Sequence, residues 1–364
     1  MKIAFRVDAS IEIGSGHVMR CLTLADELKK RGADTQFIMR THPGHLADIA
    51  CKRGHEVQVL KCMDVKYFPV RDDTAHAKWL GVSWVQDAEE TLQVLGDDMV
   101  DWLIVDSYAL DERWHKCLRS VARRILVIDD MNDRNMDCDL FLDQTNGRQK
   151  SDYSKCLSED CRMLLGAKYA LLRPEFSQFR EAALKRREEF RGVRKILVSM
   201  GGSDPANVTG LVLDGLAEVE WSFLPQIEVI LGNCSPHINE IRLKAKNNRL
   251  PIKVSINVSN MVERMLEADL AIGAGGSTSW ERCCLGLPTI MITIAENQKE
   301  IVRQLELSGA VVNLGESQDL VPLDIKNEID RFLKDPHAWI ALSQNAAAIC
   351  DGLGAPKVAN IIMG

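Results

Sequence analysis

The chain has 364 residues, 46% of them hydrophobic and 27% charged, with a formal net charge of −7. At about 150 residues per domain this length predicts two domains, and the acidic balance excludes the basic surface that nucleic acids and anionic membranes attract. The sequence starts in a charged strand and has no run of about 18 apolar residues, so we expect neither a signal peptide nor a membrane span. A cytoplasmic protein without nucleic-acid or membrane partners is predicted.

The cysteines and histidines predict no metal site. None of the eleven cysteines forms a C-x-x-C pair, and the adjacent Cys283 and Cys284 would point to different sides of a helix. His42 and His45 lie three residues apart, but no acidic or cysteine partner stands at ligand spacing. We expect reduced, packed cysteines, and neither a metal nor a cofactor.

Apolar strand-like runs alternate with helical patterns along the chain, which is typical of parallel sheets covered on both faces. In the first half, strands are predicted at 2–8, 34–39, 56–59, 101–106 and 124–128, and helices at 16–31, 43–53, 85–95 and 110–122. Segment 60–84 holds Tyr67, Trp79 and Trp84 but has no clear period. It is interpreted as an excursion near the binding crevice, without an assigned role.

The first strand runs into a turn that brackets His17. Gly14 and Gly16 make this turn at low steric cost, and the helix that follows begins near His17. A side chain placed there lies at the carboxyl end of a sheet, where open α/β proteins bind ligands, and the helix N-terminus favours a neutral imidazole. The position predicts a general base. The alternative is that the glycines only turn the chain and His17 caps or packs.

Polar residues also follow the next strands. The strand at 101–106 delivers Asp106 and Tyr108 to the mouth of the same crevice. A half-buried tyrosine that only closes the sheet is the alternative for Tyr108. For Asp129 and Asp130, which follow the strand at 124–128, we predict a capping or loop-fixing role.

A charged stretch of mixed sign ending at Arg194 marks a domain boundary near 175–193. The proposed division is an N-terminal Rossmann-like domain at 1–175, a linker helix at 176–193, a C-terminal Rossmann-like domain at 194–345 and a final helix at 346–364. Strands of the second series are predicted at 195–199, 226–231, 252–256, 269–272 and 288–292, and helices at 206–219, 236–246, 258–267, 277–285 and 298–308.

Two glycine-rich strand-to-helix turns in the second half predict anion binding. Residues 199–205 read Ser-Met-Gly-Gly-Ser-Asp-Pro, in which the glycines allow close approach of a ligand, Asp204 caps and Pro205 suits a first helical turn. Residues 273–282 read Gly-Ala-Gly-Gly-Ser-Thr-Ser-Trp-Glu-Arg and again place glycines and hydroxyl groups at the start of a helix. Glu281 lies just over one helical turn after Ser277. An ordinary strand-to-helix turn is the alternative for the first motif.

Other nucleotide fingerprints fail on spacing. Met19 and Thr278 stand where a dinucleotide-binding G-x-G-x-x-G would need its third glycine, and no G-x-x-x-x-G-K-[ST] string is present.

A family resemblance extends these observations. Residues 6–10 (Arg-Val-Asp-Ala-Ser) and 13–22 (Ile-Gly-Ser-Gly-His-Val-Met-Arg-Cys-Leu) resemble the opening motif of the UDP-sugar hydrolases of the pseudaminic acid pathway, which cleave UDP-2,4-diacetamido-2,4,6-trideoxy-beta-L-altropyranose. Tyr108 matches the tyrosine of that family's Asp-x-Tyr, and Asn297 with Gln298 matches its Asn-Gln. The motifs of the second half resemble the nucleotide half of the GT-B fold, as in the peptidoglycan N-acetylglucosaminyltransferase.

The resemblance implies an α/β, GT-B-like protein with two doubly wound Rossmann-like domains facing across a cleft, whose final helix crosses back to the first domain. It implies that His17 is the catalytic base. Its implied substrate-binding residues are Asp8, Gly14, Gly16, Arg20, Tyr108, Asn297 and Gln298. Its implied UDP-binding residues are Gly201, Gly202, Ser203, Gly275, Gly276, Ser277, Thr278 and Glu281.

The function implied is metal-independent hydrolysis of a UDP-linked diacetamido trideoxy sugar with inversion at the anomeric carbon. A small-molecule UDP-sugar is the partner expected for a monomeric protein. Three alternatives stay open: a GT-B glycosyltransferase, an epimerising UDP-sugar hydrolase of the sialic acid type, and a sugar-nucleotide sensor without turnover. The preferred acyl substituents and ring configuration do not follow from the sequence.

Overall fold

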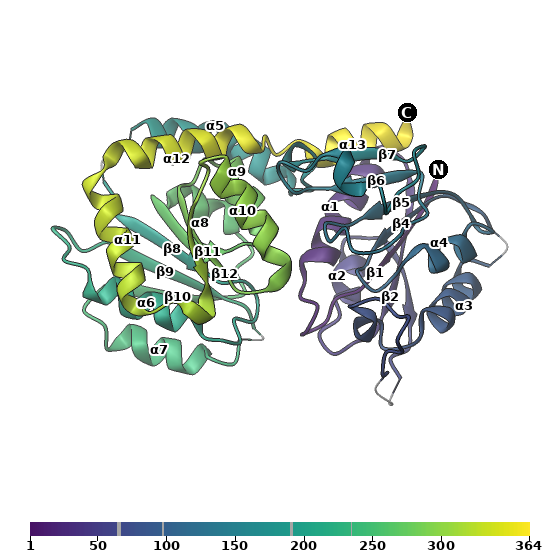
Figure 1. The fold of residues 1–364 in the computed structure, drawn as a ribbon, viewed down its shortest axis with the longest axis horizontal. Coiled ribbons are helices and arrows are strands. Elements are labelled where there is room, and N and C mark those ends of the chain that lie inside the picture. The colour runs from purple at the N-terminus through teal and green to yellow at the C-terminus, as the bar shows by residue number, and fades with distance from the viewer. Residues whose placement is uncertain (64–66, 97, 190–191, 234) are drawn as a thin grey trace. The chain divides into compact units, whose positions relative to one another are not determined.

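The computed structural model describes residues 1–63, 67–96, 98–189, 192–233 and 235–364. The chain forms two compact units, and the first is discontinuous in sequence (Figure 1). It comprises Met1–Leu171 together with Gly354–Gly364, whereas the second comprises Leu172–Leu353. Part of segment 60–84, namely residues 64–66, lies outside the described residues, as do residues 190–191 of the predicted linker.

The first unit is built on a parallel sheet, seven-stranded over the described residues, with the order β3-β2-β1-β4-β5-β6-β7. Its strands are β1 (Lys2–Val7), β2 (Asp34–Arg40), β3 (Glu56–Leu60), β4 (Val100–Asp106), β5 (Ala122–Ile128), β6 (Leu140–Asp143) and β7 (Arg162–Leu165). From the central pair β1 and β4, the strands continue through β2 to β3 on one side of the sheet and through β5 and β6 to β7 on the other. The crevice between the ends of β1 and β4 is therefore the point where an open α/β sheet binds ligands.

Helical segments cover both faces of this sheet. Successive strand residues point to opposite faces and are apolar on both, so both faces need to be covered. They are α1 (Gly16–Lys30), α2 (Ala47–Lys52), η1 (Ala77–Leu80), α3 (Trp84–Leu95), α4 (Glu112–Leu118), η2 (Lys150–Tyr153), η3 (Ala167–Tyr169) and α13 (Gly354–Met363). Phe5 and Ile104 point to the core shared with α1 and α13, whereas Ala4 and Leu103 point to the core shared with α3 and α4.

A buried ion cluster lies in the second of these cores. Arg6 of β1 and Arg40 of β2 both donate to Asp87 of α3, and all three side chains are fully buried. Trp114 also donates its indole N–H to Asp87 over 3.1 Å. Burial acts to raise the pKa of Asp87, but the two arginines lower it below its ordinary value. This carboxylate therefore stays charged and fixes α3 against the strands.

The second unit repeats the architecture with a parallel sheet, six-stranded in the part of the chain described, ordered β10-β9-β8-β11-β12-β13. Its strands are β8 (Lys195–Ser199), β9 (Gln226–Leu231), β10 (Ile252–Ile256), β11 (Leu270–Ala274), β12 (Thr289–Thr293) and β13 (Val312–Glu316). Its helical segments are α5 (Pro174–Glu188), α6 (Val208–Glu218), α7 (Ile238–Lys246), α8 (Met261–Glu267), α9 (Thr278–Cys284), η4 (Glu296–Gln298), α10 (Lys299–Leu307), η5 (Ser317–Asp319), α11 (Pro322–Lys334) and α12 (Pro336–Ile349). The corresponding switch point lies between β8 and β11.

Helix α5 is part of the second unit rather than a linker between two domains, and this differs from the proposed division. Arg180 donates to the carbonyl oxygens of Cys284, Ala347 and Cys350. Arg187 donates to those of Met265 and Ala268. The charged stretch near 185–189 therefore includes a buried side chain, Arg187, that binds backbone carbonyl groups. The mixed charge of the sequence alone indicated a solvated helix or linker.

One apolar segment, Pro336–Met363, is long and hydrophobic enough to pass a membrane-span criterion, which differs from the sequence-based expectation. The structure divides it into α12 and α13, which belong to different units (Figure 1). Trp339 of α12 is buried in the second core, and Val358 and Ile362 of α13 are buried in the first. Both helices therefore contribute apolar side chains to protein cores, while Ile340 of α12 is exposed.

Candidate active site

The first predicted site lies at the switch point of the first sheet. Val7, the last residue of β1, is the register partner of Asp106, the last residue of β4. The loops that follow these two strands therefore start side by side. They carry Asp8 and the turn to α1 on one side, and Ser107 and Tyr108 on the other.

The turn before α1 folds back on Ser10. The Ser10 carbonyl accepts from the Gly14 N–H over 2.8 Å, while the Ser10 hydroxyl oxygen accepts from the Ile13 N–H over 2.9 Å. Gly14 has φ of +82°, a conformation that disfavours residues with a side chain. Helix α1 then starts at Gly16, which places His17 in its first turn.

His17 is hydrogen-bonded to a buried carboxylate. Its Nδ1 lies 2.5 Å from Oδ1 of Asp106, which is fully buried, while the His17 side chain keeps 11% of its surface exposed. When Nδ1–H donates to Asp106, the other nitrogen, Nε2, is left as a proton acceptor. Nδ1 also lies 3.3 Å from a terminal nitrogen of Arg20. With the proton on Nδ1, the pair has the arrangement that a general base needs.

Arg20 completes this arrangement. Its Nε and one terminal nitrogen donate to the two oxygens of Asp106, each over 2.6 Å. Burial acts to raise the pKa of Asp106, but the charges of Arg20 and His17 outweigh it and hold that pKa well below its ordinary value. Asp106 is therefore an anion at neutral pH. Arg20, predicted to bind substrate, pairs with this carboxylate through two of its nitrogens, and its contact with substrate stays a prediction.

Tyr108 lies against His17 in an edge-to-face contact, with ring centroids 4.8 Å apart. Its hydroxyl donates to Asp130 over 2.5 Å, and burial together with Asp130 raises its pKa well above the ordinary value. A small pocket is lined by Asp8, Ile13, His17, Trp79, Asp106, Ser107 and Tyr108. His17 and Tyr108 therefore share one pocket.

Two aspartates expected near this site have structural partners. Asp8 lines the pocket, but its carboxylate accepts from the Arg40 N–H over 2.6 Å and pairs with Arg6 over 2.7 Å. Each of its oxygens thus has a protein partner, and its predicted contact with substrate stays a prediction. Asp129 accepts from the Met131 N–H, the loop-fixing role that the sequence predicts.

In the first glycine-rich loop of the second unit, the amides at the start of the helix are not free to bind an anion, whereas the sequence predicted that they would. Helix α6 starts at Val208, and its first amides are already satisfied. Val208 and Thr209 donate to the carboxylate of Asp204, each over 2.9 Å, while Gly210 donates to Asn207. A ligand anion would thus have to bind the loop ahead of the helix, where Gly201, Gly202 and Ser203 keep surface exposed.

The second glycine-rich loop follows β11, next to β8 in the sheet. Gly275 is buried and its N–H donates to Oε1 of Gln298, which also accepts from the Ile294 N–H. Gln298 thus ties two loops together through its carbonyl oxygen, and its predicted contact with substrate stays a prediction. Of the other predicted ligands, Gly276, Ser277 and Thr278 lie at the start of α9 with partial or full exposure, and Asn297 is exposed.

Glu281 is the most perturbed carboxyl group of this loop region. Burial raises its pKa to about 7, although Arg173 and Arg282 oppose this shift. The nearest cation, a terminal nitrogen of Arg173, lies 3.9 Å from Oε1, too far for a hydrogen bond. A half-buried carboxyl group so weakly paired is typical of a ligand-binding residue.

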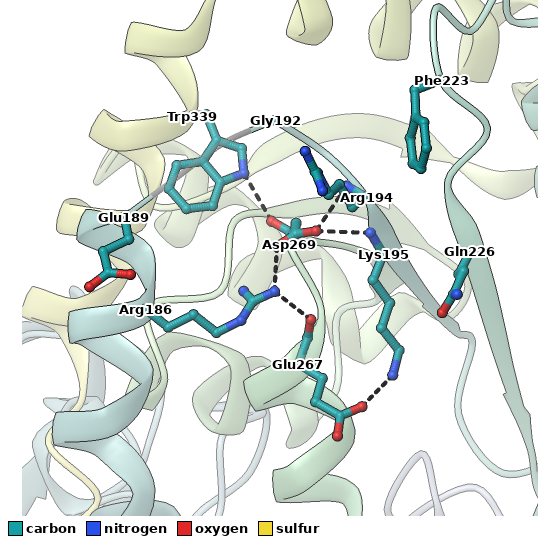
Figure 2. A pocket seen from close by; sticks show the side chains of 10 residues that line it. All are labelled: Arg186, Glu189, Gly192, Arg194, Lys195, Phe223, Gln226, Glu267, Asp269 and Trp339. Atoms are coloured by element: carbon teal, nitrogen blue, oxygen red, sulfur yellow. Dashed lines mark hydrogen bonds and ion pairs between the residues drawn. The ribbon is translucent and has the colours of Figure 1, made fainter.

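A larger cavity of the second unit lies at the opposite edge of the sheet, by the amino ends of its strands (Figure 2). Asp269 accepts there from Arg186 over 2.6 Å and from the N–H groups of Arg194 and Lys195, while Lys195 also pairs with Glu267. These charged side chains bind one another and tie α5 to the sheet. None of the residues that line this cavity was predicted as a site residue.

Sequence reasoning missed Asp106 as a site residue. It was placed at the crevice mouth, but its pairing with His17 depends on the register of β1 with β4. A search for clusters of at least three His, Cys, Asp or Glu side chains able to hold a metal finds none within the ranges that the structure describes.

Comparisons with known proteins agree with this architecture. Residues 196–357 match the family model described as Glycosyltransferase family 28 C-terminal domain. The uncharacterized protein MJ1062 of Methanocaldococcus jannaschii is 29% identical over 306 residues, and the match covers 82% of this chain but only 57% of that protein. A UDP-2,4-diacetamido-2,4,6-trideoxy-beta-L-altropyranose hydrolase of Campylobacter jejuni is 25% identical over 312 residues, covering 85% of this chain and 97% of that enzyme.

Among solved structures, MurG of Acinetobacter baumannii superimposes with a TM-score of 0.68 at 12% identity, covering 100% of this chain and 99% of that one. Similarity at this identity establishes the fold alone. The predicted fold class is confirmed: the chain has the GT-B fold, and its second unit resembles the C-terminal domain of family 28 glycosyltransferases.

Proposed function

We propose that the protein hydrolyses a UDP-linked 2,4-diacetamido-2,4,6-trideoxy sugar to UDP and the free sugar, with inversion at the anomeric carbon. The observation that carries this proposal is the contact between His17 and Asp106 at the switch point of the first sheet. The similarity to the Campylobacter jejuni hydrolase supports the choice of substrate. His17 is assigned as the base, and Glu281 and the glycine-rich loops are assigned to UDP.

In this mechanism Nε2 of His17 removes a proton from water as the water oxygen attacks the anomeric carbon. The bond from that carbon to the UDP oxygen breaks, and its electron pair leaves with UDP. Asp106 stabilises the imidazolium that forms, and Arg20 keeps Asp106 ionised. Glycosidases usually present two carboxyl groups, but a nucleoside diphosphate is a good leaving group, so one base can suffice.

Glycosyl transfer is the second candidate, favoured by the match of residues 196–357 to a glycosyltransferase domain. Both reactions use a UDP-sugar and a base, so they differ in the group that attacks. Release of free sugar and UDP from the purified protein, without an acceptor, supports hydrolysis. Turnover only after an alcohol acceptor is added would establish transfer.

The remaining alternatives are separated by the same assay. An epimerising hydrolase would incorporate deuterium from heavy water beside the anomeric carbon, whereas direct displacement would leave that position unlabelled. A sensor would bind the UDP-sugar and release no UDP with any acceptor.

We expect Glu281→Ala to weaken the binding of UDP by about 10- to 150-fold, because a hydrogen bond to a charged group contributes roughly 1.5–3 kcal/mol. Calorimetry with UDP alone measures this change. Glu175→Ala is the matched control, since Glu175 also pairs with Arg173 but is not assigned to the nucleotide. Equal affinities for Glu281→Ala and the wild type would remove Glu281 from the nucleotide site.

The same contact should depend on pH. Because burial raises the pKa of Glu281 to about 7, its carboxyl group loses its proton as the pH rises through neutrality. The ionised form accepts hydrogen bonds from ribose hydroxyls better, so the ratio of wild-type to Glu281→Gln affinity should increase between about pH 6 and about pH 8. Taking this ratio cancels the titration of UDP itself. A ratio that does not change with pH would contradict the assignment.

Metal independence stays a prediction, and chelation tests it. Full turnover is expected after prolonged treatment with EDTA, because the proposed mechanism assigns the diphosphate to backbone amides and side chains. Activity that disappears with EDTA and returns with magnesium or manganese would show that a cation takes part.

A further inference from the structure

Trp79 belongs to the stretch between β3 and α3 to which the sequence assigned no role. The 3₁₀ helix η1 carries it, and its indole lines the same pocket as His17, Asp106 and Tyr108. The side chain is only partly buried, so part of the indole stays accessible beside the proposed base.

Several contacts fix the position of η1. Ala77 and Leu80 are buried on either side of Trp79, and the Trp79 N–H donates to the carbonyl of His76 over 2.9 Å. Lys78 pairs with Glu12 in the turn before α1 over 2.6 Å, although this exposed pair contributes little energy. These contacts fix the backbone that carries the indole.

The rings around the pocket form a continuous aromatic wall, defined here as His17, Tyr108, His76 and Trp79. Tyr108 lies 4.8 Å from His17 and 5.8 Å from Trp79, measured between ring centroids, and its ring is inclined by 33° to the indole. His76 packs edge-on against Trp79 at 4.5 Å. The wall thus extends from the proposed base to the indole.

The polar groups of the pocket are largely committed to protein partners. Asp106 binds His17 and Arg20, and the Tyr108 hydroxyl donates to Asp130. The lining also includes one edge of His17, the Ser107 hydroxyl and the apolar parts of Ile13 and Trp79. Pockets with an aromatic wall and few polar groups bind the apolar parts of small molecules.

We propose that Trp79 determines which sugar reaches His17, by packing its indole against the C–H and methyl groups of the sugar. This inference rests on the proposed function, since it assigns the sugar of a UDP-sugar to the His17 pocket. A sugar with deoxy carbons or acetamido methyl groups offers more apolar surface to this wall than a fully hydroxylated one.

The test compares UDP with the UDP-linked 2,4-diacetamido-2,4,6-trideoxy sugar by calorimetry, in a His17→Asn background that prevents turnover. Trp79→Ala should weaken binding of the UDP-sugar by about 10- to 100-fold, the range for a buried aromatic anchor, and leave UDP binding unchanged. Trp79→Phe should stay within about 3-fold, because it keeps an aromatic face. Trp84→Ala is the matched control, since Trp84 packs against Arg113 outside the pocket.

If Trp79→Ala does not fold, Trp79→Leu keeps apolar volume and should still lose at least about 3-fold affinity for the UDP-sugar alone. Unchanged UDP-sugar affinity in the Ala or Leu variant would overturn the role of Trp79, as would an equal loss for UDP and UDP-sugar. A His17→Asn protein with Trp79 intact that binds the UDP-sugar no better than UDP would overturn it too. If binding depends on Trp79 but the protein with His17 intact releases no UDP from the UDP-sugar, hydrolysis is refuted and the role of Trp79 stands.

Discussion

A His17→Asn variant is expected to lose about 100- to 10,000-fold in kcat, the usual contribution of a general base. Asparagine keeps much of the size and polarity of the side chain but has no basic nitrogen to accept the proton of water. Turnover is measured as UDP released from the UDP-sugar over a range of pH.

Binding and stability supply the controls for this variant. UDP affinity should not change, because the nucleotide is assigned to the second unit, and the Tm measures how much the lost contact with the buried Asp106 affects folding. Wild-type turnover by the Asn variant at every pH would show that His17 is not the base.

Asp106→Asn is expected to reduce kcat by up to about 10,000-fold, although Asp106 itself need not touch the substrate. The new amide can donate to Nδ1 of His17, which would move the ring proton to Nε2 and remove the acceptor that faces the water. The variant also leaves Arg20 without its anionic partner, so unfolding by urea has to be measured alongside turnover.

The double variant His17→Asn/Asp106→Asn separates positioning from a general loss of structure. If Asp106 acts through His17, the double variant should be no slower than His17→Asn alone. If the fold-loss in kcat of the double variant equals the product of the losses of the two single variants, Asp106 acts independently of His17. A shifted pH profile in the folded Asp106→Asn variant would be a further sign of positioning.

The fold followed from sequence wherever strands were long and apolar. The predicted strands of both halves up to β12 lie within about two residues of the observed ones, which is the usual precision for element boundaries. The exceptions are short strands: β6 and β7 have four residues each, and β13 has only half-buried residues in its sequence Val-Asn-Leu-Gly-Glu. Such strands carry too little periodicity to be recognised alone.

The candidate site was predicted less completely, because it depends on pairings between distant segments. A rule about strand ends places His17 and Tyr108 near each other, but which carboxylate binds His17 depends on register. The family resemblance implies that Gln298 contacts substrate, and the structure adds that its carbonyl oxygen accepts from two backbone amides, a role that no motif indicated. Trp79 had no periodic neighbours to suggest its position, since a 3₁₀ helix of four residues carries it.

The discontinuity of the first unit affects how the protein is made. Helix α13 supplies Val358, Ala359 and Ile362 to the core beneath α1, and the Trp102 indole donates to the Ile362 carbonyl over 3.1 Å. A nascent chain has no such residues to bury until residues 354–364 emerge from the ribosome. The second unit is contiguous in sequence and needs no such residues, whereas the first unit, which carries His17, completes its core only after residues 354–364 have been made.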